Sequence, residues 1–197
     1  MDESVSDSVR RSVRERLDAL RAEDALVDLF GREPSMSGVM RLAADSEYAT
    51  RMTFLQWTYS ESDGDARQEF ALAADETQKH YELIAGQLPA GFEASDDSPL
   101  HERLREQEET VVRVASGLVG RHLAAVQLHR RIATFFRERD VPDVAEKLEE
   151  IAEEERARVR RADDLLADLC ETEDDRATAI EAAERTIREA TQGLHGE

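Results

Sequence analysis

Cysteine is almost absent from this chain, since Cys170 is the only one among 197 residues. A single thiol excludes an internal disulfide and a metal cluster held by several thiolates. Proline occurs four times and aromatic residues make up 5% of the chain, while Ala, Leu, Glu and Arg fill long stretches. This composition favours an all-α protein, and no alternating strand pattern competes with it.

Long apolar runs are also missing, and no stretch of about 18 apolar residues exists that could cross a membrane. The first four residues, MDES, are acidic and lack the basic and then apolar profile of a secretion signal. We therefore expect a cytoplasmic protein. The sequence contains no Gly-x-Ser-x-Gly nucleophile motif, phosphate-binding glycine loop or dinucleotide fingerprint, which argues against those enzyme classes.

Positive charge is scarce and comes almost wholly from arginine. Asp and Glu total 45 against 26 Lys and Arg, which gives a net charge of −19, and Lys79 and Lys147 are the only lysines. An acidic surface with Arg in place of Lys resembles halophilic proteins, in which salt screens self-repulsion. An acidic surface for a cationic partner is the alternative. The lack of a basic patch argues against nucleic-acid binding.

What the chain has in abundance is apolar residues spaced three or four apart, the pattern of amphipathic helices. The predicted helices are a leader at about 4–29, four long helices at about 37–60, 66–88, 100–139 and 142–169, and a tail helix that begins near 173. The third long helix is expected to break near residues 105–109. The linker at 89–99 reaches roughly 35 Å when extended. A long crossover between two hairpins and a plain up–down connection therefore both remain open.

Polar side chains interrupt the apolar stripes of these helices, and a buried ionisable group is costly unless it is paired or bound to metal. The interrupting residues are Glu47 on the first long helix, Thr77 and His80 on the second, His122 and His129 on the third, and Glu155 and Arg158 on the fourth. Glu47 precedes Thr77 by 30 residues and His122 precedes Glu155 by 33, which indicates two copies of one hairpin. Carboxylate and imidazole at i and i+3 suit iron or manganese.

A short stretch occurs twice in these helices, as ADETQKH at residues 74–80 and as AEEERAR at residues 152–158. It resembles the A-x-x-E-x-x-H segment with which the ferritin-like superfamily, particularly its rubrerythrin and bacterioferritin branches, binds iron. The resemblance covers about residues 38–169. It includes EYATRMTF at 47–54, which is similar to the family's first glutamate helix. It implies a four-helix bundle around a di-iron carboxylate site.

Carried over by position, the resemblance implies that Glu47, His80 and Glu155 are retained ligands. The other three ligand positions would be changed, with Thr77 in place of a Glu, His122 in place of a Glu and Arg158 in place of a His. Half of each motif is therefore altered. The resemblance supports the fold more directly than it supports bound iron.

Three hypotheses follow. In the first, the fold is kept and the metal is lost, because Arg158 supplies the positive charge and pairs with Glu47 or Glu155 in a buried network. That network would extend to Thr77 and His129. The second hypothesis is a site for one iron, manganese or zinc ion with oxygen, peroxide or storage chemistry, formed by Glu47, His80, His122 and Glu155. In the third, these side chains lie at the edge of the bundle and the family match is accidental.

The sequence thus predicts an all-α, ferritin-like four-helix bundle over residues 35–170, with a helical leader at 1–34 and a tail helix at 171–197. The amphipathic leader and tail need a surface to cover, and they could cap the bundle or build a dimer. We expect a homodimer. We expect a non-catalytic structural or interaction module with no cofactor, or with iron or manganese. The alternatives are a metal-binding oxidoreductase or iron and oxidative-stress protein, and a helical regulator that docks a partner through its leader.

Overall fold

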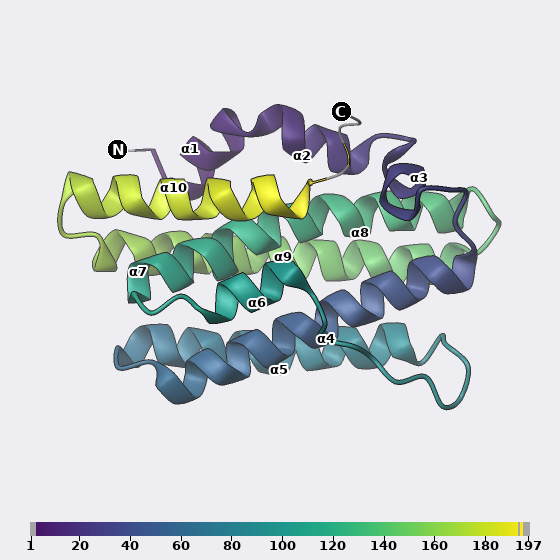
Figure 1. The fold of residues 1–197 in the computed structure, drawn as a ribbon, viewed down its shortest axis with the longest axis horizontal. Helices are drawn as coiled ribbons and strands as arrows, with labels where there is room; N and C mark the ends of the chain where they lie inside the picture. The colour runs from purple at the N-terminus through teal and green to yellow at the C-terminus, as the bar shows by residue number, and fades with distance from the viewer. Residues whose placement is uncertain (1–2, 193, 195–197) are drawn as a thin grey trace. The chain divides into compact units, whose positions relative to one another are not determined.

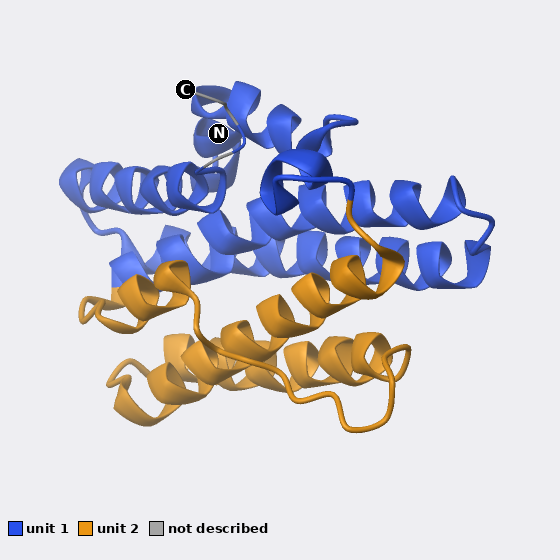
Figure 2. Cartoon of the chain, turned by 45° about the vertical axis from the view of Figure 1, so that its right-hand side comes forward, with its two compact units in different colours: residues 1–33, 111–197 blue, residues 34–110 orange. Residues whose placement is uncertain are grey.

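The computed structural model describes residues 3–192 and 194, and this part of the chain is helical and contains no strand. The predicted all-α class is confirmed. The chain forms two compact units, coloured separately in Figure 2: residues 1–33 with 111–197 (unit 1) and residues 34–110 (unit 2). This division differs from the predicted leader, bundle and tail. The segment 35–170 is shared between the units, and the leader and tail both belong to unit 1.

Unit 2 is built on the hairpin of α4 (Met36–Ser60) and α5 (Gly64–Ala85). The carboxylate of Asp63 starts α5 by accepting a hydrogen bond from the Ala66 amide at 2.8 Å. Phe54 and Trp57 of α4 pack against Phe70 of α5, with ring centroids 6.2 and 5.2 Å from that of Phe70. These aromatic contacts fix how the two helices face each other.

After α5 the chain runs back along α4 through α6 (Pro99–Arg105), as Figure 1 shows. Four contacts in sequence order record this path: Ser95 N with Asp45 Oδ1 at 3.0 Å, His101 Nε2 with Thr50 Oγ1 at 2.9 Å, Gln56 Nε2 with the Arg105 carbonyl at 3.1 Å, and Thr110 Oγ1 with Glu61 Oε1 at 2.8 Å. Residues 95–110 therefore run parallel to α4. The predicted break near 105–109 is confirmed, because α6 ends at Arg105 and α7 (Thr110–Arg113) follows.

Unit 1 is centred on α8 (His122–Arg137) and α9 (Pro142–Leu169), which pack against each other. The segment before α8 is a π-helix, η1 (Val114–Arg121), in which all eight residues are buried. Such i→i+5 helices are rare and occur mostly as short insertions, often at functional positions. The sequence pattern predicted one continuous α-helix here, so η1 is a departure from that expectation.

The leader forms α1 (Val5–Ser12), α2 (Arg14–Arg21) and α3 (Ala25–Phe30), and the tail forms α10 (Glu173–Ala190). Within unit 1, Figure 1 shows α1, α2 and α10 on one side of the α8–α9 pair. The apolar face of the leader is buried there, through Val5, Val9, Val13, Leu17 and Leu20. Ser6 adds two hydrogen bonds to the Asp163 carboxylate of α9, at 2.8 Å from its amide and 2.5 Å from its hydroxyl.

The leader therefore covers a surface of its own chain. The apolar face on which the homodimer and the partner-docking regulator were predicted is occupied inside unit 1. The oligomeric state stays a prediction. Across the described residues, no helix combines the length and the hydropathy that a membrane crossing requires.

Candidate functional site

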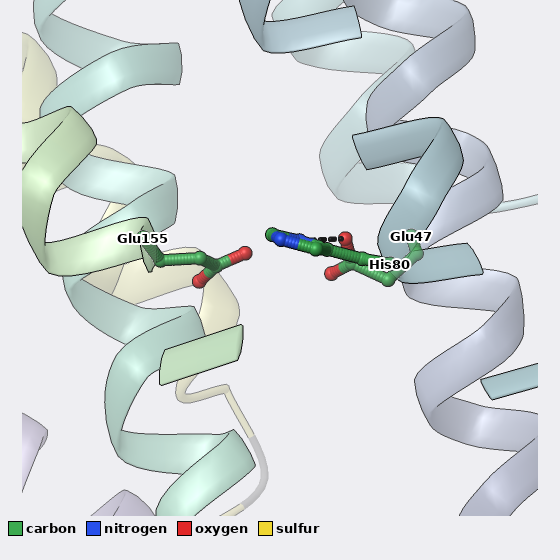
Figure 3. Close-up of side chains that lie close together, drawn as sticks. All are labelled: Glu47, His80 and Glu155. Atoms are coloured by element: carbon green, nitrogen blue, oxygen red, sulfur yellow. Dashed lines mark ion pairs between the residues drawn. The ribbon is translucent and has the colours of Figure 1, made fainter. Parts of the chain in front are cut away.

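The first candidate group lies in unit 2, where α4 carries Glu47 and α5 carries His80 (Figure 3). His80 Nδ1 lies 3.3 Å from Glu47 Oε2, and both side chains are buried. Thr77, one turn before His80, is also buried. The hairpin thus brings together one carboxylate and one imidazole. Two such ligands are fewer than the four or more that iron or zinc sites take.

The second candidate group lies in unit 1 around Glu155 of α9, which Figure 3 also draws. Arg121 Nη1 donates a hydrogen bond to Glu155 Oε1 at 2.8 Å. His122 Nδ1 lies 3.6 Å from the same oxygen, and His129 Nδ1 lies 3.8 Å from Oε2. Both carboxylate oxygens therefore face positive or imidazole groups. We call the following buried residues the unit 1 network: Arg121, His122, His129, Glu155 and Arg158.

His122 lies between two guanidinium groups. Its Nε2 is 3.3 Å from Arg158 Nη1, and its Nδ1 is 3.2 Å from Arg121 Nη1. A neutral imidazole has one accepting nitrogen, so only one of these guanidiniums can donate to it. The Glu155 carboxylate beside Nδ1 favours a proton on that nitrogen, which assigns Nε2 as the acceptor from Arg158.

The environment holds His122 neutral and Glu155 charged. Burial lowers the pKa of His122 to about 3, Arg158 adds to this shift, and the Glu155 carboxylate opposes it. Burial raises the pKa of Glu155, but Arg121 and then His122 and His129 outweigh burial and hold that pKa well below its usual range. The network at neutral pH is therefore a carboxylate and a neutral imidazole paired with guanidinium ions.

The candidate residues thus divide between the two units. The first group holds Glu47, Thr77 and His80, and the second holds His122, His129, Glu155 and Arg158. Glu155 is buried although Glu153 and Glu154 beside it are exposed, so the acidic run does not simply face solvent. Arg158 is among the largest fully buried side chains, which the first hypothesis requires.

The sequence pattern did not identify Arg121, although its Nη1 donates a hydrogen bond to Glu155 Oε1 at 2.8 Å. The predicted stripe passes through His122, and on an α-helix the preceding residue, Arg121, points about a quarter turn away from it. One signal was present in the sequence: between Arg113 and Arg130, Arg121 is the only Asp, Glu, Lys or Arg. A single charge in so long an apolar stretch indicates a buried, paired group rather than a solvated face.

The chain was compared with models of protein families, with curated proteins and with solved structures, and none of them matches it. The resemblance to the ferritin-like superfamily is therefore carried by the doubled motif and by residues 47–54.

Proposed function

We propose that the chain is a ferritin-like helical protein in which buried guanidinium groups take the place of metal, and that it acts as a non-catalytic structural or interaction module. The observation that carries this proposal is the 2.8 Å hydrogen bond between Arg121 Nη1 and Glu155 Oε1, made between buried side chains. A carboxylate that is already neutralised by a guanidinium does not need a metal ion as its counter-charge.

The unit 1 network does not fit iron or manganese. The Nε2 atom of His122 accepts a hydrogen bond from Arg158, and its Nδ1 atom points toward Glu155, so both ring nitrogens are already engaged. A divalent cation bound to Glu155 would lie close to the Arg121 guanidinium, and like charges repel strongly where little water is present. These residues are therefore unsuited to a di-iron centre.

The path of unit 2 supports the ferritin-like part of the proposal. Residues 95–110 run parallel to α4, so the chain enters the unit at the start of α4 and leaves near Glu61, past its end. A connection that returns along the full length of the first helix is the long crossover that distinguishes ferritin-like bundles from plain up–down bundles. The doubled motif on α5 and α9 adds a second, independent likeness.

A second candidate function is metal binding, and the buried Glu47–His80 pair favours it. Carboxylate and imidazole are ligands for iron, manganese and zinc. This candidate needs further ligands besides the two that the hairpin supplies. It keeps open an oxidoreductase or an iron and oxidative-stress protein.

Metal analysis separates the two functions. Protein purified in high salt is expected to contain far less than one iron, manganese or zinc ion per chain, and added ions are expected to leave its unfolding midpoint unchanged. A site occupied at 100 times its Kd would stabilise the fold by about 2.7 kcal/mol. Elemental analysis and thermal unfolding with and without Mn²⁺, Fe²⁺ or Zn²⁺ measure both quantities.

The matched control for this experiment is Glu47→Gln, which keeps the side-chain shape and removes the ligand charge. A stabilisation by metal that disappears in Glu47→Gln would establish the metal-binding candidate and contradict the metal-free proposal. A stabilisation that persists in the variant would indicate binding by other acidic groups of this highly charged chain.

A further inference from the structure

The π-helix η1 ends at the residue that holds the unit 1 network together. Its last residue is Arg121, and α-helical geometry resumes at His122. The change of register therefore falls between two neighbouring side chains that both reach Glu155 Oε1, at 2.8 and 3.6 Å. On a continuous α-helix, neighbouring residues point about a quarter turn apart. The register of η1 thus helps to decide whether Arg121 can reach Glu155.

The tail helix α10 lies close to η1 at Gly120, the residue before Arg121. A Cβ atom at this position would lie 2.6 Å from the Ala183 carbonyl oxygen and 2.9 Å from Thr186 Cβ. The backbones of η1 and α10 therefore approach each other as closely as only glycine allows. The buried side chains of α10 are mostly small, namely Ala179, Ala182, Ala183, Thr186 and Ile187.

The α10 helix is itself held in place by the leader. It packs against α1, and α1 also contacts η1 and α9. The Ser6–Asp163 hydrogen bonds fix α1 on α9. Helices α1 and α10 thus form one layer over η1, and the residues of the unit 1 network lie outside both helices.

We propose that α10 is a strap: by packing against Gly120 it holds η1 in the π-helical register and keeps Arg121 on Glu155. When α10 detaches from η1, this constraint is lost. The η1 segment then adopts the commoner α-helical hydrogen bonding, and Arg121 no longer contacts Glu155. The tail helix controls the buried charges through this contact.

Hydrogen exchange in the full-length protein tests the strap. Ile187 is fully buried on α10, so Ile187→Ala removes packing contacts and loosens this helix. The substitution adds no atom beside η1. We expect the α10 amides and the Arg121 guanidinium protons to exchange at least about tenfold faster than in the parent protein, and by a common factor. The amides of α9 are expected to keep their rates, since the opening is local. NMR measures all three, with the Arg121 signals assigned by Arg121→Lys.

Gly120→Ala is the second variant and pushes directly on Ala183 and Thr186. We expect this variant also to accelerate hydrogen exchange of the α10 amides and of the Arg121 guanidinium protons. Gly64→Ala is the matched control, because a Cβ there meets no atom within 4 Å. If Gly120→Ala fails to fold, the exchange rates of Ile187→Ala alone test the proposed role of α10. Faster α10 exchange with unchanged Arg121 protons overturns the proposal, and so does a uniform acceleration that includes α9.

Discussion

Replacing Arg121 with Met is expected to lower the free energy of unfolding by about 3–5 kcal/mol. Arg121 donates to Glu155 at 2.8 Å, and both side chains are buried. Met retains much of the apolar stem of Arg, so the variant removes the charge and leaves little empty volume. The buried Glu155 carboxylate then loses a counter-charge that lies 2.8 Å away. Denaturant unfolding at pH 7 in high salt measures the change.

An exposed pair of the same length provides the control. Arg185 and Glu181 of α10 are also 2.8 Å apart, but their side chains are 60% and 68% exposed. Arg185→Met is expected to change the free energy of unfolding by less than about 1 kcal/mol, because water and salt screen the pair. Burial, and not distance, therefore sets the expected difference between the two variants. A loss below about 1 kcal/mol for Arg121→Met would contradict the network.

The Glu155 carboxylate can be neutralised to test the cause of that loss. The double variant Arg121→Met with Glu155→Gln is expected to be about 1–3 kcal/mol more stable than Arg121→Met alone. The glutamine amide has nearly the shape of the carboxylate but carries no charge that needs a counter-ion. If the second change brings no recovery, the loss in Arg121→Met comes from packing instead of from the unpaired charge.

Much of the helical structure could be predicted from local pattern. The first long helix was expected at about 37–60 and occurs as Met36–Ser60, and the fourth was expected at about 142–169 and occurs as Pro142–Leu169. Helix ends of this kind are set by capping residues and by apolar spacing, which are local properties of the sequence. The break near 105–109 was visible for the same reason.

The candidate site was predicted less completely. The stripe positions identified Glu47, His80, His122, His129 and Glu155 as polar residues on the core faces of their helices, because side chains one or two turns apart share a helix face. The π-helical register of η1 could not be predicted, since no local sequence pattern indicates it and the apolar spacing fits an α-helix equally well. Arg121 was missed as a consequence. The docking of α10 at Gly120 depends on residues far apart in the chain, which spacing does not reveal.

Acid is expected to destabilise the protein from about pH 6.5 downward, before its carboxylates titrate. His122 has a pKa of about 3 in the folded protein against 6.5 when exposed. Between these values the unfolded chain binds a proton at this residue and the folded chain does not, so stability falls as the pH falls. Each pH unit in this window costs about 1.4 kcal/mol, or roughly 5 kcal/mol over the whole of it. Glu155 adds a further loss below about pH 4.5, because its folded pKa is also lowered.

His122→Gln isolates the contribution of this one imidazole. An amide at residue 122 can still accept from Arg158 and donate toward Glu155, but it does not titrate. The slope of stability between pH 6.5 and 4.5 is expected to be shallower in the variant by about 1.4 kcal/mol per pH unit. Denaturant unfolding at several pH values in constant high salt measures both slopes. Equal slopes in the two proteins would mean that His122 accepts a proton in the folded state, and the guanidinium-filled network would then be wrong.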